Sequence, residues 1–258
     1  MKQGQSENTE EKSRGFSSVF TQQVAVVSNS LAMKHCRYVH VDLHAGCGWN
    51  DEVDVIGSPL LFQSIARSSR MDYRMFCCEI DKERCRQLGD RLAKDSCSFP
   101  HWGNNSELCA MLPDLLRAHD VEPSMAIGSI LVDPNGFVDQ IPWGELSKLF
   151  KVCGRMDVVF NFPGTAYTRN VGHPEHVHID RLPMLLNKKH WFIRHPLRTQ
   201  KFTLCIGRNT DKLKIPSRLG LPFAEWDSND GKWYRMKAMH TQSELDRMPM
   251  PGQMEFSF

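Results

Sequence analysis

The chain has 258 residues and a formal net charge of +2, with 41% hydrophobic and 24% charged residues. That length accommodates one large α/β domain, and the hydrophobic share is sufficient for a buried core. No hydrophobic run approaches the roughly 20 residues that span a bilayer, and the polar first residues lack the apolar region of a secretory signal. The sequence therefore argues against a membrane protein and predicts a cytoplasmic location.

Composition divides the chain into four predicted parts. Residues 1–14 are polar and carry both signs of charge, which is typical of a disordered segment. Residues 15–180 form a predicted cofactor-binding domain, residues 181–248 a basic and proline-rich part, and residues 249–258 a flexible tail. The nine cysteines show no CxxC spacing, so we predict free thiols in a reducing compartment rather than a disulfide framework.

Hydrophobic spacing predicts helices and strands in alternation. In chain order they are a helix over 16–33, a strand over 38–43, a strand over 73–79, a helix over 82–94, a helix around 108–116, a strand over 129–133, a helix over 143–151 and a strand over 157–162. Such alternation indicates right-handed βαβ units and predicts a Rossmann-like α/β fold, with a mostly parallel sheet and helices on both faces. Two later stretches, 201–206 and 233–236, are predicted strands of a β-rich extension that completes the sheet.

The first predicted strand runs into a turn of small residues. Asp42 ends the strand, and Gly46 and Gly48 follow within the turn. Open α/β sheets bind ligands at the carboxyl ends of their strands, and glycine lets the backbone approach a ligand closely. The turn lacks the GxGxxG pattern of dinucleotide sites, so it favours the phosphate-free S-adenosylmethionine (SAM). Binding of NAD is the alternative.

Acidic and amide side chains follow the next two strands. Glu79 ends the second strand, where a carboxylate can accept hydrogen bonds from both ribose hydroxyls. Asn104 and Asn105 stand where the third strand should end and can read an adenine edge, which Trp102 can flank. The predicted cofactor-binding residues are Asp42, His44, Ala45, Gly46, Gly48, Glu79, Ile80, Asn104 and Asn105.

A second turn, Asp133-Pro134-Asn135-Gly136, follows the apolar strand over 129–133. The aspartate, or a backbone carbonyl beside it, can accept hydrogen bonds from a target NH2 group and direct the nitrogen lone pair toward a methyl donor. Amino methyltransferases carry Asp/Asn-Pro-Pro-aromatic here, and the aromatic stacks on a flipped base. This chain has Asn135 and Gly136 instead, and a plain β-turn is the alternative reading. The predicted catalytic residues are Asp133, Pro134, Asn135 and Phe137.

The residues after the strand over 157–162 form a candidate substrate wall. Asn161 can hydrogen-bond substrate, Tyr167 can stack on a base and Arg169 can bind a phosphate. Residues 188–218 are strongly basic, with Asp211 as the one acid, and can follow a phosphate backbone; a solvated basic face is the alternative. The predicted substrate-binding residues are Asn161, Tyr167, Arg169, Lys188, Lys189, Arg194 and Arg198.

Two further chemistries are not expected from the sequence. His173, His176 and His178 lie close together, but no Cys or acid accompanies them at ligand spacing, so we predict no metal site. A cytosine C5 methyltransferase would need a nucleophilic Cys after a Pro at the second turn, and none follows Pro134.

Several short segments together resemble the three-Cys-motif partner proteins, which are class I methyltransferase-like proteins of bacteria and mobile elements. The matching segments are 41–46, 57–60, 133–137, 141–143, 161–162 and 169–170, within residues 15–210. The resemblance implies that Asp42, Gly46 and Gly48 form the SAM loop, that Glu79 binds the ribose, and that Asp133-Pro134 is the catalytic turn. The family has an aromatic residue at the third position of that turn, where this chain has Asn135.

These patterns predict a SAM-dependent methyltransferase that acts on nucleic acid. The favoured acceptor is N6 of adenine, in DNA rather than RNA. The alternative is a non-catalytic partner protein of a mobile-element or defence system, which binds nucleic acid or a nuclease. An NAD-dependent oxidoreductase is the third hypothesis.

Overall fold

A computed structural model describes residues 9–30, 36–51, 54–134, 136, 140–173, 176–196, 202–210 and 222–248. The chain forms two compact units, one of residues 1–132 with 142–157 and one of residues 133–141 with 158–258. The units differ from the predicted parts 15–180 and 181–248 because residues 133–141 and 158–180 group with the later elements. Within the described residues, no helix is both long and apolar enough to cross a membrane.

The first unit contains four parallel strands in the order β6-β1-β4-β5. They are β1 (Tyr38–Asp42), β4 (Tyr73–Glu79), β5 (Ser98–Trp102) and β6 (Ile127–Val132). All five residues of β1 are buried, as expected for a parallel strand covered on both faces. The strand order reverses between β1 and β6, and open α/β sheets bind their ligands at such a switch point.

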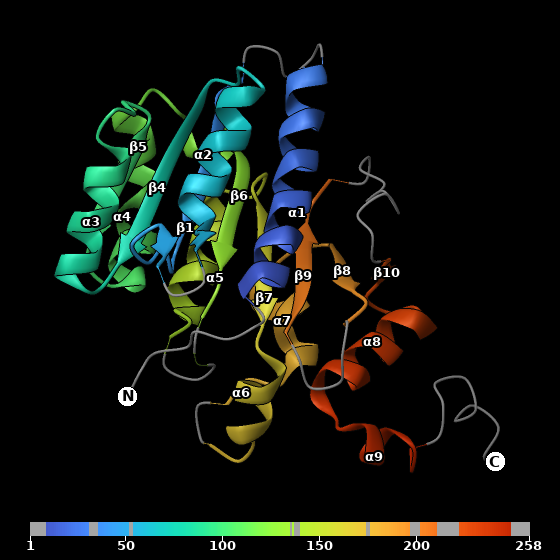
Figure 1. The fold of residues 1–258 in the computed structure, drawn as a ribbon. Coiled ribbons are helices and arrows are strands. Elements are labelled where there is room, and N and C mark those ends of the chain that lie inside the picture. The colour runs from blue at the N-terminus through green and yellow to red at the C-terminus, as the bar shows by residue number, and fades with distance from the viewer. Residues whose placement is uncertain are drawn as a thin grey trace. The chain divides into compact units, whose positions relative to one another are not determined.

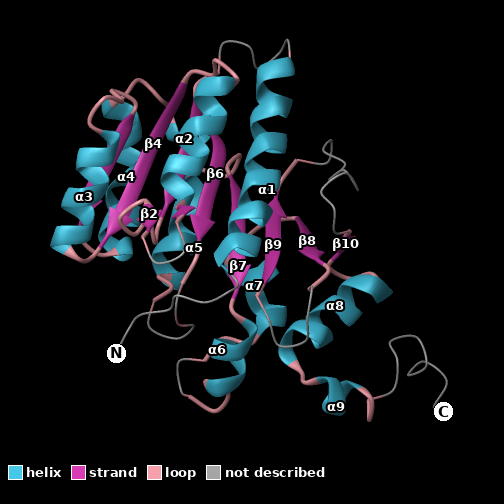
Figure 2. Ribbon diagram, in the orientation of Figure 1, coloured by secondary structure: helices cyan, strands magenta, loops and turns pink. Residues whose placement is uncertain are grey.

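Helices cover both faces of these strands. They are α1 (Thr9–Asn29), α2 (Ser58–Ser68), α3 (Lys82–Leu92), α4 (Asn105–Ala118) and α5 (Trp143–Val152), with a 3-10 turn η1 (Pro123–Met125) and a short antiparallel pair β2 (Trp49–Asn50) and β3 (Val55–Ile56). Helix α1 packs against α2, and α4 packs against α5. Figures 1 and 2 show α1 and α2 in front of the strands and α4 behind them. The predicted Rossmann-like fold with a parallel sheet between helices is confirmed.

The second unit is built on antiparallel pairs in the order β10-β8-β9-β7. Its strands are β7 (Asp157–Phe162), β8 (His190–Arg194), β9 (Thr203–Arg208) and β10 (Phe223–Glu225). Its helices are α6 (Gly164–Arg169), α7 (Leu182–Leu185), α8 (Asn229–Met239) and α9 (Gln242–Leu245), with a 3-10 turn η2 (Ile179–Arg181). Helix α8 packs against β8, β10 and α6, so the C-terminal helices belong to this core.

Three sequence expectations need correction. Helix α1 begins at Thr9, so residues 9–14 are helical and not part of a disordered segment. Residues 233–236, predicted as a strand, lie in α8, whose first turn is capped because the Ser228 side chain accepts a hydrogen bond from the Gly231 N–H. No strand was predicted over residues 190–194, where β8 pairs with β9 and β10. The predicted tail 249–258 lies outside the described residues.

Candidate cofactor site and catalytic turn

The Asp42 carboxylate fixes the turn that follows β1. Asp42 is fully buried; its Oδ1 accepts a hydrogen bond from the His44 N–H at 3.0 Å, and its Oδ2 accepts one from the Ser58 hydroxyl at 2.5 Å. Ser58 is the first residue of α2, so Asp42 joins the turn to that helix. Hydrogen bonds to an ionised acceptor are among the stronger ones in proteins. Asp42 therefore acts as a positioning residue of the turn.

Glycine is required at several points of this turn. Gly46 and Gly48 have φ angles of +62° and +80°, in the left-handed region that other residues rarely adopt. The Gly57 N–H donates to the Gly48 carbonyl at 2.8 Å, and a Cβ at Gly57 would lie 2.8 Å from the Gly48 carbonyl carbon. The Ala45 N–H donates to the Cys78 carbonyl at 3.0 Å. The turn is therefore held against both β4 and the start of α2, and we call it, together with Glu79, the cradle.

Glu79 ends β4 beside this turn. Its side chain is 8% exposed, and its Oε1 accepts a hydrogen bond from the Asp81 N–H at 2.9 Å. Its Oε2 lies 3.8 Å from Nε of Arg84. Burial, together with the negative charges of Glu79 and Asp42, raises the pKa of the Cys78 thiol to about 12. Both predicted acids thus contribute negative charge at this edge of the sheet.

Exposed apolar surface lies next to Glu79. The side chains of Ile80 and Trp102 are 73% and 58% exposed, and the Trp102 indole N–H donates to the Ile80 carbonyl at 3.2 Å. The Lys82 ammonium lies 4.8 Å from the centre of the Trp102 ring. An aromatic base can pack on such a surface. The predicted position of an adenine ring here is consistent with this arrangement.

The two predicted amides at the start of α4 have different surroundings. Asn104 caps the helix, since its side chain accepts a hydrogen bond from the Glu107 N–H at 2.8 Å, and reading adenine would compete with this cap. Asn105 lies with its Nδ2 3.2 Å from Nε2 of His44, so it contacts the turn after β1. Of the two, Asn105 therefore lies against the predicted cofactor turn, and its role in binding adenine stays a prediction.

The second predicted turn lies in the second unit. Asp133 is partly exposed, and its Oδ1 accepts a hydrogen bond from the Asn161 side-chain amide at 2.8 Å. Asn161 is 3% exposed and comes from β7. The Gly136 N–H donates to Oε1 of Gln140 at 2.8 Å, which closes the turn. The predicted catalytic residues Asn135 and Phe137 lie outside the described residues.

Tyr167 does not have the exposed ring that base stacking requires. It is 3% exposed, and its ring packs 5.0 Å from the ring of Phe162 and 4.5 Å from that of His176. Its hydroxyl accepts a hydrogen bond from the Ile179 N–H at 3.5 Å. The predicted stacking role is therefore corrected to a core role. Arg169 is exposed and donates to the Thr165 carbonyl at 3.2 Å, so its predicted phosphate contact remains sterically open.

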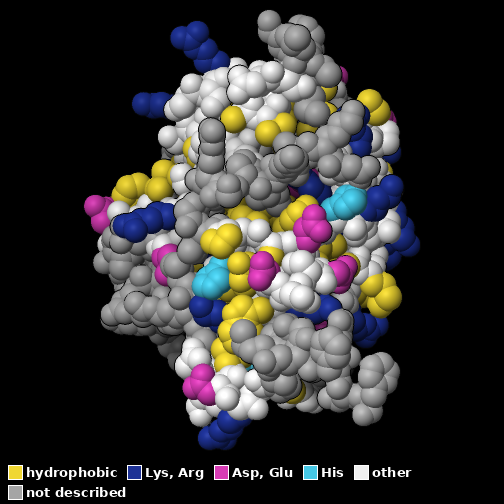
Figure 3. Space-filling model, turned by 90° about the vertical axis from the view of Figure 1, so that its right-hand side faces the viewer, with side chains coloured by type: hydrophobic (Ala, Val, Ile, Leu, Met, Phe, Trp, Pro, Cys, Tyr) yellow, Lys and Arg dark blue, Asp and Glu magenta, His cyan; other side chains and the backbone are white. Residues whose placement is uncertain are grey.

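Some basic side chains of residues 188–218 are buried, whereas an exposed basic surface was predicted. Lys188 and Arg194 are 4% and 5% exposed, so their predicted contacts with a nucleic-acid backbone are not available in this conformation. Lys189 is exposed, and Arg198 lies outside the described residues. In Figure 3, the Lys and Arg side chains that are coloured lie mostly toward the edges of the face, while hydrophobic, acidic and His side chains share its middle. On this view, the described side chains form no continuous basic stripe.

Sequence reasoning missed two residues that contact the predicted cofactor-binding acids, Ser58 beside Asp42 and Arg84 beside Glu79. Ser58 had a signal, because it stands in the Gly-Ser-Pro segment that marked the resemblance. Arg84 had none, since it is one of several charged residues in α3. All nine cysteines are free, and no group of three His, Cys, Asp or Glu residues in the described part of the chain is arranged to hold a metal ion.

Comparison with known proteins supports the fold. No family model and no curated protein matches the chain, so membership of the three-Cys-motif partner family stays a prediction. Protein LPL1258 of Legionella pneumophila, which carries the designation DUF519, is 12% identical with a TM-score of 0.56, covering 81% of this chain and 88% of its own. A candidate methyltransferase from Thermobifida fusca is 11% identical with a TM-score of 0.49, covering 78% and 83%. An rRNA methylase from Streptococcus thermophilus is 9% identical with a TM-score of 0.41, covering 74% and 95%. At 12% identity, the similarity to LPL1258 shows the fold alone.

Proposed function

We propose that the protein is a SAM-dependent methyltransferase that acts on nucleic acid. The observation that carries this proposal is the glycine turn after β1, which is hydrogen-bonded to β4 and to Gly57 before α2. Glu79 lies at the end of the adjacent parallel strand β4. Such a turn lets the protein backbone approach a ligand closely, and a carboxylate at the next strand end suits ribose hydroxyls. When bound, SAM would supply an electrophilic methyl group.

The charges of the cradle favour SAM over NAD. Asp42 and Glu79 are both buried at the ends of adjacent strands. Two carboxylates favour a ligand that carries a positive sulfonium and ammonium. The turn also lacks the third glycine of the dinucleotide pattern. The residues of this site therefore fit SAM better than NAD.

Asp133 is the proposed contact for the methyl acceptor. It follows Val132, the last residue of β6, and the Asn161 amide holds its Oδ1. A carboxylate fixed in this way can accept a hydrogen bond from an exocyclic NH2 and direct the nitrogen lone pair. A nitrogen–carbon bond would form as the carbon–sulfur bond breaks, and the amine would lose a proton to Asp133 or water. We propose N6 of adenine as the acceptor, with DNA as the first substrate to test and RNA as the second.

A transfer assay tests this function. Purified protein is incubated with methyl-labelled SAM and either genomic DNA or total RNA, and the nucleosides are then identified by mass spectrometry. We expect labelled N6-methyladenosine or its deoxy form. Asp133→Ala should lower the rate at least about a hundredfold because it removes the acceptor contact, and should leave the affinity for SAM within about twofold. Asp114→Ala is the matched control, since Asp114 is exposed on α4.

The same assay tests the non-catalytic alternative. That hypothesis draws on Asn135-Gly136, which replace the Pro-aromatic pair of amino methyltransferases. It predicts binding of SAM without transfer to DNA or RNA. Such a result, or full activity of the Asp133→Ala variant, would contradict the proposed catalytic turn.

A further inference from the structure

Arg84 is a cationic side chain in the cofactor cradle that neither the motif pattern nor the resemblance identified. We propose that Arg84 binds the carboxylate of the methionine half of SAM and thereby determines which adenosine ligands the protein accepts. This inference rests on the proposed function, because it takes SAM as the ligand. It adds a specificity-determining residue to that site.

The position of Arg84 is fixed by the start of α3. Its backbone N–H donates to the Asp81 side chain at 2.9 Å, which caps the helix and places Arg84 in the first turn. Its side chain reaches back over the cradle, since a Cβ built on Gly46 would lie 3.0 Å from a terminal guanidinium nitrogen. The side chain is 40% exposed. A ligand lying on the Gly46 backbone would therefore contact the guanidinium.

The guanidinium of Arg84 lies near Glu79 and has the donor geometry that matches a carboxylate. Nε of Arg84 lies 3.8 Å from Oε2 of Glu79, beyond hydrogen-bond distance, so charge attraction and not a directed bond joins them. A guanidinium has five N–H donors in a planar fork that matches a carboxylate. The terminal nitrogen near Gly46 belongs to that fork.

The negative charges of Asp42 and Glu79 explain why a SAM carboxylate would need a cation nearby. The sulfonium and ammonium of SAM suit the negative charge of Asp42 and Glu79, but its carboxylate would be repelled by the same two acids. A cation over Gly46 removes that repulsion. The competing explanation is that Arg84 serves only to hold Glu79, in which case it would influence every ligand with a ribose equally.

Ligands that lack the carboxylate alone, or the whole amino-acid half, separate the two explanations. Calorimetry on the full chain should compare SAM, decarboxylated SAM, which lacks only the carboxylate, and methylthioadenosine, which lacks the whole amino-acid half. We expect the wild-type protein to bind SAM about ten- to hundredfold more tightly than decarboxylated SAM. Arg84→Gln should remove most of this preference and leave methylthioadenosine binding within about twofold. Arg84→Lys should retain part of it, because the charge remains and the fork is lost.

Arg86→Gln is the matched control, since Arg86 is on the same helix and pairs at the surface with Glu83 and Asp90. It should leave all three affinities unchanged. Thermal melting of each variant checks folding, and Arg84→Lys keeps the test decisive if Arg84→Gln does not fold.

The outcomes separate this assignment from the function on which it rests. If the wild-type protein binds SAM and Arg84→Gln keeps the full preference over decarboxylated SAM, the assignment is overturned and the proposed function stands. If the Gln variant loses affinity equally for all three ligands, Arg84 acts through Glu79 and the assignment is again overturned. If the wild-type protein binds none of the three, both the SAM site and the assignment fail.

Discussion

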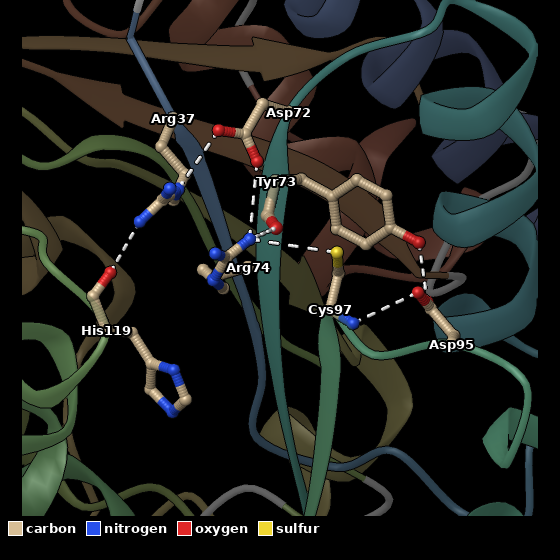
Figure 4. A network of polar contacts seen from close by, with 7 residues as sticks. All are labelled: Arg37, Asp72, Tyr73, Arg74, Asp95, Cys97 and His119. Atoms are coloured by element: carbon tan, nitrogen blue, oxygen red, sulfur yellow. Dashed lines mark hydrogen bonds and ion pairs between the residues drawn. The ribbon is translucent and has the colours of Figure 1, made fainter.

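The two ends of the parallel strands in the first unit both carry charged residues, but they use them differently. At the amino end, Arg37 Nε lies 3.0 Å from Asp72 Oδ2, and Arg74 lies 3.3 Å from the other oxygen of Asp72. Arg37 also donates to the His119 carbonyl at 2.6 Å. Figure 4 shows these side chains pointing toward one another. At the amino end, the charged side chains therefore bind one another and the neighbouring backbone.

Asp95 is the most enclosed acid of this amino-end network. It accepts hydrogen bonds from the Tyr73 hydroxyl at 2.5 Å, from the Gln63 amide at 2.8 Å and from the Ser98 hydroxyl. Burial alone would raise the pKa of Asp95, but the hydrogen bonds from Ser98, Tyr73 and Gln63 outweigh it and lower the pKa to about 2. This carboxylate, which precedes β5, therefore joins α2, β4 and β5.

The carboxyl end has acids as well, but they support backbone and leave apolar surface exposed. Asp42 and Glu79 each accept a backbone N–H from the residue two positions later. Gly46 and Gly48 have positive φ angles in the turn after β1, and Trp102 stays exposed at the end of β5. The comparison indicates that side-chain contacts join neighbouring elements at the amino end, whereas the carboxyl end keeps the exposed surface at which we propose that the ligand binds.

Asp95→Ala should produce the largest effect on stability, because it leaves the hydroxyls of Tyr73 and Ser98 and the Gln63 amide without their acceptor. Loss of a buried network of this kind costs about 3 kcal/mol. Urea denaturation followed by circular dichroism measures it, and the affinity for SAM should stay within about twofold.

Asp90→Ala is the matched control for this substitution. Asp90 is an exposed acid of α3 that pairs with Arg86, so its loss should hardly move the urea midpoint. A loss of SAM affinity in Asp95→Ala comparable to its loss of stability would show that the two ends of the strands do not act separately.

His40, in the middle of β1, makes the stability of the protein depend on pH. It is fully buried, stacks 4.1 Å from the Phe62 ring and contacts the Ser129 hydroxyl at 3.0 Å. Burial lowers its pKa from 6.5 to about 3. Because the folded pKa is the lower one, the unfolded chain binds the proton more readily below pH 6.5, and stability falls as the pH falls from 6.5 toward 3. The contribution of His40 to this loss is about 2 kcal/mol at pH 5.

Urea denaturation at pH 7 and pH 5 measures this loss in the wild-type protein and in His40→Gln. Gln does not titrate, so the variant should lose about 2 kcal/mol less between the two pH values than the wild type. Equal losses in the two proteins would show that His40 does not stay neutral in the folded state.

The fold was largely predictable because hydrophobic pattern and strand position agree. The strands over 73–79 and 157–162 were predicted with the bounds that the structure has. Residues 233–236 misled the prediction, since a run of Trp, Tyr, Arg and Met suits a strand as well as a helix, and the cap at Ser228 decides between them. The short strand β8 contains His190 and Arg194, and a strand with polar ends gives little periodic signal.

The candidate site was predictable in part, for similar physical reasons. Gly46, Gly48 and Glu79 follow strands that the hydrophobic pattern predicts, so their positions at neighbouring strand ends could be predicted, while their role in binding a cofactor stays a prediction. Burial of Lys188 and Tyr167 depends on contacts between distant segments, and composition alone suggested a surface role. The contact between Asp133 and Asn161 joins residues that are 28 positions apart, so only the folded chain shows it.

The smallest effect on stability, and a clear effect on ligand binding, is expected from Glu79→Gln. The variant keeps an acceptor for the Asp81 N–H but loses the negative charge that strengthens bonds to ribose hydroxyls. The affinity for S-adenosylhomocysteine should fall about tenfold by calorimetry, which corresponds to about 1.4 kcal/mol. The urea midpoint should change much less than in Asp95→Ala. Because the two variants are expected to move opposite readouts, a loss of stability without a loss of affinity in Glu79→Gln would place this acid with the structural network and not with the ligand.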